Sequence, residues 1–326
     1  MNRRKFFTVS AASGAISSIA ALGLGRAAYA SDCSRTQTGR VPVNDLGTGT
    51  YQGAQGGLYP GGVNDRPATH DQNGQYLANN VVQPRDRQGA VDPVNGRIVF
   101  VSTGMSNTTQ EFSYFIQSVQ GDPRLHPKLT IVDGAQGGRD AVDWSDPNST
   151  TWSVLANRLT AAGVTAPQVQ VMWLKHQIRG DDLVNFPQDA QHLRDLLRGI
   201  VTIARARYPN LRLAFMSSRS YGDYNGEARG TGAYEQAFAV KWLIEDQING
   251  DPRLNYGNSG PVPWLSWGTY LWADGLAGRS DGLTWACGDF VTDGIHPTTS
   301  GKEKVRGQLL KFLTRDPTAT PWFLAG

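Results

Sequence analysis

The feature that most constrains the fold is an alternation of short apolar stretches with helix-like stretches between residues 97 and 314. In the clearest helical stretch, residues 188–207, apolar side chains recur at three- and four-residue steps with charged residues between them. We expect four buried strands, over residues 97–102, 128–132, 169–174 and 211–216, and helices around residues 112–119, 152–162, 188–207, 234–248 and 302–314. Strands that alternate with helices through short links predict an α/β protein, with a parallel sheet covered by helices on both faces.

The rest of the chain predicts one folded domain with two N-terminal additions. Residues 31–95 are rich in Gly, Asn, Asp, Gln and Pro and show little periodicity, so we expect an irregular extension packed on the domain. Residues 96–326 would form the domain itself. Residues 1–30 have the character of a targeting segment.

That N-terminal segment holds four basic residues and no acidic one. An Arg3-Arg4 pair, a mildly apolar stretch and a small-x-small sequence ending at Ala30 are typical of an export signal, and the arginine pair resembles the twin-arginine type. The alternative is a membrane anchor, but the apolar stretch contains many Ser, Gly and Thr residues. We therefore expect passage through the twin-arginine export machinery, cleavage near Ala30 and Ser31, a periplasmic or extracellular location, and no stable membrane anchor.

Charge and composition exclude several classes of protein. The net charge of +3 includes four bases of the leader; without them, 27 bases face 28 acids, a net of −1. No nucleic-acid partner is needed to explain the basic character. A chain that is 39% hydrophobic and 18% charged is not a disordered protein. Two cysteines exclude a disulfide-rich scaffold and a zinc site built on thiolate pairs.

Polar residues that follow the expected strands suggest acyl-transfer chemistry, because active residues gather at the carboxyl ends of parallel strands. Ser106 follows the first strand, and Asp293 and His296 precede the last helix. A serine hydroxyl becomes a nucleophile when a histidine takes its proton and a carboxylate orients that histidine. The alternative for Ser106 is a helix cap. The amides of Ser106 and Gly138 are candidates for an oxyanion hole.

This order of motifs resembles the SGNH hydrolase superfamily, also called GDSL esterases and lipases. The resemblance covers about residues 96–315 and rests on Gly-Met-Ser-Asn at 104–107, the glycine loop at 134–138 and Asp-Gly-Ile-His-Pro at 293–297. It implies a flavodoxin-like three-layer α/β/α sandwich, a catalytic triad of Ser106, Asp293 and His296, an oxyanion donor at Gly138, and no cofactor.

One departure from the family concerns the oxyanion hole. The family usually has Gly-x-Asn after the third strand, whereas this chain has Lys175-His176-Gln177. Either His176 or Gln177 would then supply the missing donor, with Lys175 as a third option. A metal site built from His176, Asp293 and His296 is a different alternative, although we expect no metal.

Further candidates lie around the expected site. Arg139 and Arg219 each follow a strand and would either bind an acidic substrate group or form ion pairs between loops. Lys175 is a third basic candidate for substrate binding. Trp267 and Trp272, in an aromatic stretch, would either form a platform for sugar rings or cover the core.

The two cysteines, Cys33 and Cys287, would meet an oxidising compartment after export. They either form a disulfide, which would pin the N-terminal extension beside the Asp293 loop, or remain two buried thiols.

Together these features predict an exported serine esterase that hydrolyses O-acyl esters, most simply acetyl esters, on an acylated polysaccharide. A lipid or aryl esterase, or an acyltransferase, would use the same fold. An alternative of another class is a non-catalytic glycan-binding protein on a degenerate hydrolase fold.

Overall fold

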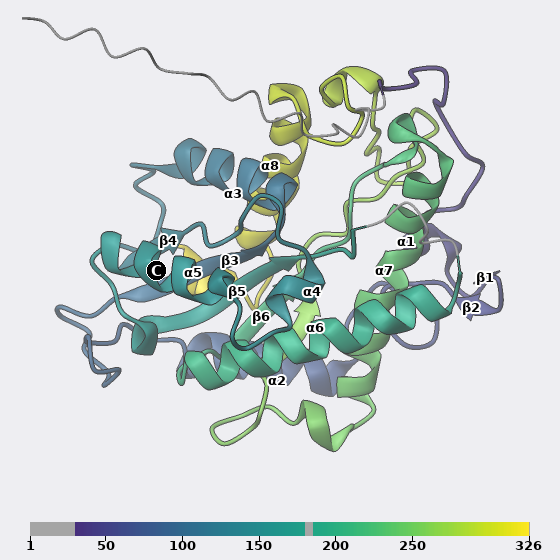
Figure 1. The fold of residues 1–326 in the computed structure, drawn as a ribbon. Helices are drawn as coiled ribbons and strands as arrows, with labels where there is room; N and C mark the ends of the chain where they lie inside the picture. Colours follow the sequence, from purple (N-terminus) through teal and green to yellow (C-terminus); the bar gives the residue numbers. More distant parts are fainter. Residues whose placement is uncertain (1–29, 180–184, 326) are drawn as a thin grey trace, which may run out of the picture.

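The computed structural model describes residues 30–179 and 185–325, which are built around a five-stranded parallel sheet (Figure 1). Its strands are β3 (Ile98–Gly104), β4 (Leu129–Val132), β5 (Val169–Lys175), β6 (Leu213–Met216) and β7 (Trp264–Trp267). They lie side by side in the order β4-β3-β5-β6-β7. Numbered along the chain, this is the 2-1-3-4-5 order of the flavodoxin-like doubly wound fold. The expected α/β fold is confirmed.

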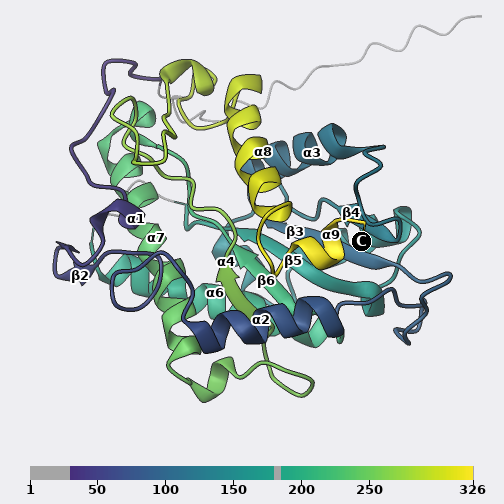
Figure 2. The ribbon, with the colours of Figure 1, turned by 180° about the vertical axis from the view of Figure 1, so that it is seen from behind.

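Helices cover both faces of the sheet, and the residues of β3, β5, β6 and β7 are therefore buried on both sides. One layer contains α6 and α7, which pack against each other, with α4 and α5 (Figure 1). The opposite layer contains α2, α3, α8 and α9 (Figure 2). The bounds are α2 (Ala68–Asn80), α3 (Ser106–Val119), α4 (Ala141–Trp144), α5 (Thr150–Ala161), α6 (Gln188–Arg207), α7 (Glu227–Ile248), α8 (Thr299–Leu313) and α9 (Thr320–Phe323).

The N-terminal extension is more regular than expected. It contains the short helix α1 (Val43–Leu46), the two-residue strands β1 (Thr50–Tyr51) and β2 (Ala54–Gln55), and the 13-residue helix α2. The many Asn and Gln residues of α2 hide its helical period. Its close packing depends on Gly74, where a Cβ atom would lie 2.4 Å from the Trp264 ring.

Contacts with distant residues hold the start of the extension in place. The carboxylate of Asp274 accepts hydrogen bonds from the backbone N–H groups of Thr38 and Gly39, at 2.7 and 2.9 Å. A disulfide joins Cys33 to Cys287, whose Cα atoms are 5.4 Å apart. The expected leader, residues 1–30, lies outside the described residues except for Ala30. Within the described ranges, no helix is both long and apolar enough to cross a membrane.

Candidate active site

Ser106 lies at a tight turn between the central strand and the helix that follows it. Strand β3 ends at Gly104 and helix α3 begins at Ser106. Gly104 has a φ of +153°, and a Cβ atom there would lie 2.4 Å from both the Lys175 carbonyl oxygen and the Thr108 hydroxyl. Only glycine fits this turn, which presents Ser106 at the carboxyl edge of the sheet.

The structure brings Ser106, His296 and Asp293 into one chain of hydrogen bonds. Ser106 Oγ lies 2.7 Å from His296 Nε2, and His296 Nδ1 lies 2.5 Å from Asp293 Oδ2. Because a carboxylate only accepts, Nδ1 carries a proton and Nε2 of the neutral ring accepts from the serine hydroxyl. The Ser106 side chain does not cap α3, which excludes the alternative of a simple helix cap.

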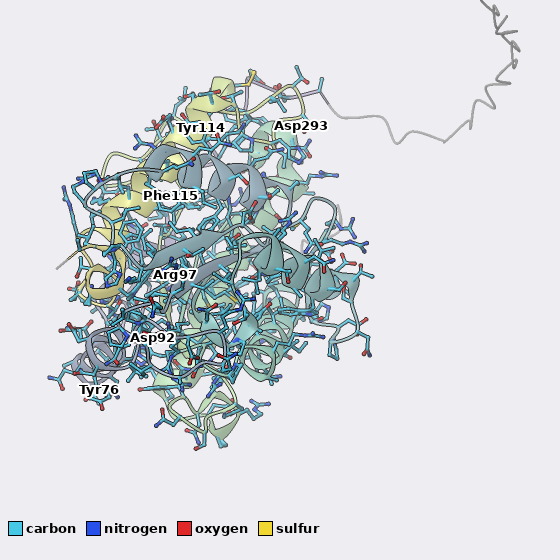
Figure 3. All side chains as sticks on the ribbon, turned by 90° about the vertical axis from the view of Figure 1, so that its left-hand side faces the viewer. Tyr76, Asp92, Arg97, Tyr114, Phe115 and Asp293 are labelled. Atoms are coloured by element: carbon cyan, nitrogen blue, oxygen red, sulfur yellow. A yellow bond between two sulfur atoms is a disulfide. The ribbon has the colours of Figure 1, made fainter. Side chains whose placement is uncertain are left out.

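Asp293 is held as a charged acceptor. Burial opposes its ionisation, but hydrogen bonds from the His296 ring and from the backbone N–H groups of Ile295 and His296 outweigh burial, so the pKa of Asp293 lies below its ordinary value. The two backbone bonds to Oδ1 measure 2.8 and 2.9 Å. Figure 3 shows Asp293 well apart from Asp92 and Arg97, which precede the amino end of β3. The carboxylate is therefore both oriented and ionised.

Two asparagines position the loop that carries Asp293 and His296, and no sequence motif indicates this role for either of them. The Asn107 amide donates to the Ile295 carbonyl at 2.7 Å, and the Asn225 amide donates to the Asp293 carbonyl at 2.6 Å. Asn107 follows Ser106 directly, so one turn of α3 presents the hydroxyl and also holds the loop that carries its partner.

The glycine loop after β4 approaches Ser106 at Gly137. A Cβ atom on Gly137 would lie 3.8 Å from Ser106 Cβ, whereas one on Gly138 would meet no atom within 4 Å. The Gln136 N–H donates to the Gly104 carbonyl at 3.0 Å and ties this glycine loop to the strand end beside Ser106. The loop named from the sequence thus lies beside Ser106, and the role of the Gly138 amide as an oxyanion donor stays a prediction.

The three candidates for the missing oxyanion donor have different environments. Lys175 is fully buried and its Nζ contacts both carboxylate oxygens of Glu111, at 2.6 and 2.5 Å, so the substrate-binding and oxyanion roles expected for it are wrong. His176 is 4% exposed, and its Nε2 lies 3.1 Å from Thr103 Oγ1. Burial lowers the pKa of His176 to about 3 and keeps the ring neutral. Gln177 is half-buried, and its side chain lines a small cavity beside Ile295.

The aromatic candidates do not form a surface platform. Trp267 is 3% exposed and Trp272 is fully buried, and both belong to the core. Trp267 Nε1 donates to the Leu58 carbonyl at 2.8 Å. The expectation of a sugar-binding platform from these two residues is wrong, because both side chains are buried in the core.

The two arginine candidates differ in environment. Arg139 is exposed and forms an ion pair at 3.1 Å with Asp143, four residues further along the chain in α4. This local pair does not join two loops, and a role of Arg139 in substrate binding stays a prediction. Arg219 is buried and lines the same small cavity as Gln177.

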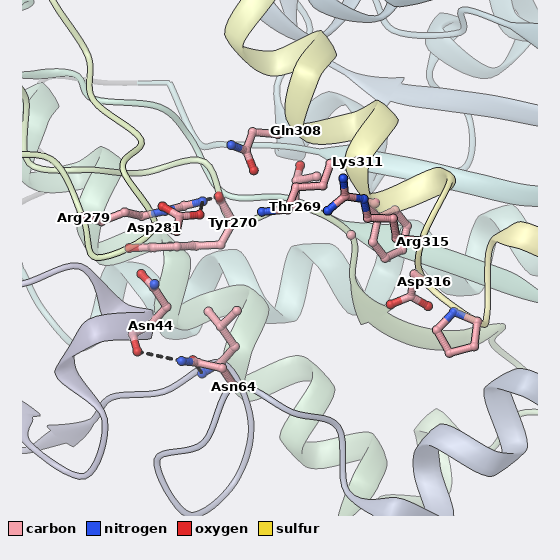
Figure 4. Close-up of a pocket in the computed structure, with 14 residues that line it drawn as sticks. Asn44, Asn64, Thr269, Tyr270, Arg279, Asp281, Gln308, Lys311, Arg315 and Asp316 are labelled. Atoms are coloured by element: carbon pink, nitrogen blue, oxygen red, sulfur yellow. Dashed lines mark hydrogen bonds and ion pairs between the residues drawn. The ribbon is translucent and has the colours of Figure 1, made fainter.

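A larger cavity of about 430 Å³ lies between the N-terminal extension and α8 (Figure 4). Its walls include Asn44, Tyr270, Arg279 and Lys311 but none of Ser106, Asp293 and His296. In the described part of the chain, no group of three or more His, Cys, Asp and Glu residues is placed to hold a metal ion.

Comparisons with known proteins find similar folds at low sequence identity. The chain resembles a carbohydrate esterase family 3 protein from Talaromyces cellulolyticus (14% identity, 65% of this chain, 94% of that chain, TM-score 0.37). It also resembles a lipolytic G-D-S-L family member from Veillonella parvula (12%, 67%, 98%, 0.38). A third neighbour is the periplasmic domain of a Salmonella Paratyphi A lipopolysaccharide acetyltransferase (14%, 74%, 95%, 0.37). No model of a protein family and no curated protein matches the sequence.

Proposed function

We propose that this protein is a serine esterase in which Ser106, His296 and Asp293 form the catalytic triad. The observation that carries the proposal is the continuous hydrogen-bond chain from Asp293 through His296 to Ser106, formed by residues up to 190 positions apart. The site is open to solvent, since Ser106 is only half-buried and the side chains of His296 and Asp293 are 34% and 31% exposed. A helix-capping serine would not need such a pair of partners.

The geometry supports a two-step reaction. Ser106 Oγ attacks the ester carbonyl carbon while His296 Nε2 takes the hydroxyl proton, and His296 then gives that proton to the departing alcohol. Water attacks the resulting acyl-enzyme, His296 takes a proton from the water, and the carboxylic acid leaves as Ser106 regains its proton. Asp293 holds the ring in one tautomer and stabilises the imidazolium form in both steps.

The oxyanion of each tetrahedral intermediate needs hydrogen-bond donors. The backbone N–H groups of Ser106 and Gly137 are the proposed donors, because Ser106 begins α3 and Gly137 lies against it. Gln177 is the proposed third donor in place of the usual asparagine. The side-chain amide of Gln177 makes no hydrogen bond with the described residues, and Gln177 lines the small cavity together with Ile295. His176 is a weaker candidate, because its ring is buried against Thr103.

The proposed substrate is a short O-acyl ester, most simply acetyl, on a carbohydrate outside the cytoplasm. The export-type segment 1–30 supports the location, with cleavage near Ala30. The resemblance of the motifs to SGNH hydrolases supports the ester chemistry.

Hydrolysis of 4-nitrophenyl acetate by the folded protein tests the proposal. Ser106→Ala should lower kcat/KM by about 10³-fold or more, because the nucleophile of a triad is lost. Ser153→Ala, an exposed serine on α5, is the matched control and should retain wild-type activity. Phenylmethylsulfonyl fluoride should add one sulfonyl group to the wild type and none to Ser106→Ala in a mass spectrum. Equal activity of the wild type and Ser106→Ala, or no activity of the wild type toward a broad panel of esters, would contradict the esterase assignment.

A further inference from the structure

A small cavity opens directly beside the loop that carries His296. It has a volume of about 30 Å³ and is lined by residues that include Gln177, Arg219, Ser220 and Ile295. Ile295 precedes His296, and its carbonyl accepts from the amide of Asn107, the neighbour of Ser106. The small cavity therefore lies beside the loop that carries His296, although neither this cavity nor the larger one near α8 is lined by Ser106, Asp293 or His296.

Arg219 brings an unpaired cation to this cavity. Its side chain follows β6 and the residue is only 6% exposed. An arginine has five N–H donors, yet Arg219 makes no hydrogen bond and no ion pair with the described residues. Its Nη1 atom is completely enclosed without a partner. Buried polar groups in proteins nearly always have hydrogen-bond partners. The described residues supply none for this guanidinium, so we expect its partner to be a bound molecule.

The buried charges around Arg219 do not balance. Glu111 is the neighbouring carboxylate, but both its oxygens contact Lys175. Arg219 and Lys175 repel each other, and burial lowers the pKa of Arg219 while Glu111 raises it. Arginine remains protonated in proteins, so two cations face one carboxylate. Such an excess is costly inside a protein, and an anion bound in the cavity would offset it.

We propose that Arg219 binds a carboxylate group of the substrate, so that the enzyme prefers esters carrying a negative charge near the reacting carbonyl. This inference rests on the proposed esterase function and specifies its substrate class. A planar carboxylate matches the fork of a guanidinium, and its size suits a cavity of about 30 Å³. The carboxylate belongs either to the acyl group, as in a succinyl ester, or to the alcohol, as in an acetylated uronic acid.

Paired substrates test the preference and separate the two sources. Mono-4-nitrophenyl succinate is compared with 4-nitrophenyl butyrate, and methyl O-acetyl-galacturonate with methyl O-acetyl-galactoside. The wild type should show a higher kcat/KM for the charged member of at least one pair. In Arg219→Gln that preference should fall about ten- to a hundredfold, the range expected for a charge-assisted hydrogen bond. Arg219→Lys should retain part of it.

Arg212→Gln is the matched control, since Arg212 is 8% exposed and lies at the other end of β6. It should leave the preference unchanged. A wild type that favours the neutral member of both pairs, or Arg219→Gln that lowers both members of each pair equally, would overturn the proposal.

A binding measurement keeps the inference separate from the esterase assignment. Succinate and galacturonate are titrated by calorimetry into Ser106→Ala and into Ser106→Ala/Arg219→Gln, with thermal melting as a check of folding. Binding of either acid that is lost in the double variant supports the anion site even if no ester is hydrolysed. No binding of either acid to folded Ser106→Ala refutes the anion site.

Discussion

Gly294 lies between Asp293 and His296 and offers a direct test of how finely the loop must be placed. Its φ is +67°, a conformation that L-residues with a side chain adopt at a cost of about 1–2 kcal/mol. A Cβ atom would also lie 2.7 Å from the backbone carbon and oxygen of Tyr224. Ordinary contact begins at 3.4 Å, so the loop or the Tyr224 backbone must move by 3.4 − 2.7 = 0.7 Å.

Such a shift would stretch the 2.7 Å contact between Ser106 Oγ and His296 Nε2 beyond hydrogen-bond distance. We expect Gly294→Ala to lower kcat/KM for 4-nitrophenyl acetate by about 10²-fold, since a misplacement of about 1 Å has an effect of that order. Gly250→Ala is the control: its φ is +85°, but no atom lies within 4 Å of the added Cβ. It should lose stability in urea unfolding and keep its activity. Wild-type activity of Gly294→Ala, or an equal loss in Gly250→Ala, would refute the reasoning.

Two further predictions concern stability. His176 has a pKa of about 3 when buried against 6.5 ordinarily, so the unfolded chain binds more protons between these values and acid destabilises the fold. At pH 5 this effect lowers the free energy of unfolding of the wild type by about 2 kcal/mol. Between pH 7 and pH 5, the free energy of unfolding of His176→Gln in urea should therefore fall by about 2 kcal/mol less than that of the wild type. Equal losses in the two proteins would contradict this role of His176. The disulfide between Cys33 and Cys287 spans 254 residues, and the loss of loop-closure entropy should make Cys33→Ser/Cys287→Ser about 5.5 kcal/mol less stable. A reducing agent should lower the melting temperature of the wild type alone, and an unchanged melting temperature would count against the bond.

The sheet could be predicted because four of its strands are continuous apolar segments bounded by helices. The fifth strand, β7, was missed because Trp264–Trp267 is only four residues long and aromatic, which resembles a surface cluster as much as a strand. Helix α2 was missed because Asn and Gln residues weaken its apolar face. Both elements depend on tertiary packing, as the contact of Gly74 with the Trp264 ring shows.

The proposed triad was accessible from the sequence because strand ends and a short Asp-x-x-His spacing place its members. The environment of the basic residues could not be predicted from the sequence. Nothing local distinguishes Lys175, which is buried against Glu111, from Arg219, which has no partner among the residues that the structure describes, because burial depends on elements far along the chain.

The bond from the Asn107 amide to the Ile295 carbonyl has a consequence for how activity is acquired during folding. The nucleophile and its partners are separated by almost 190 residues, and the loop is held from α3 on one side and from Asn225 on the other. Local elements would form before contacts of such long range. During refolding from denaturant, esterase activity should thus return after most secondary structure, so its recovery would report completion of the native topology.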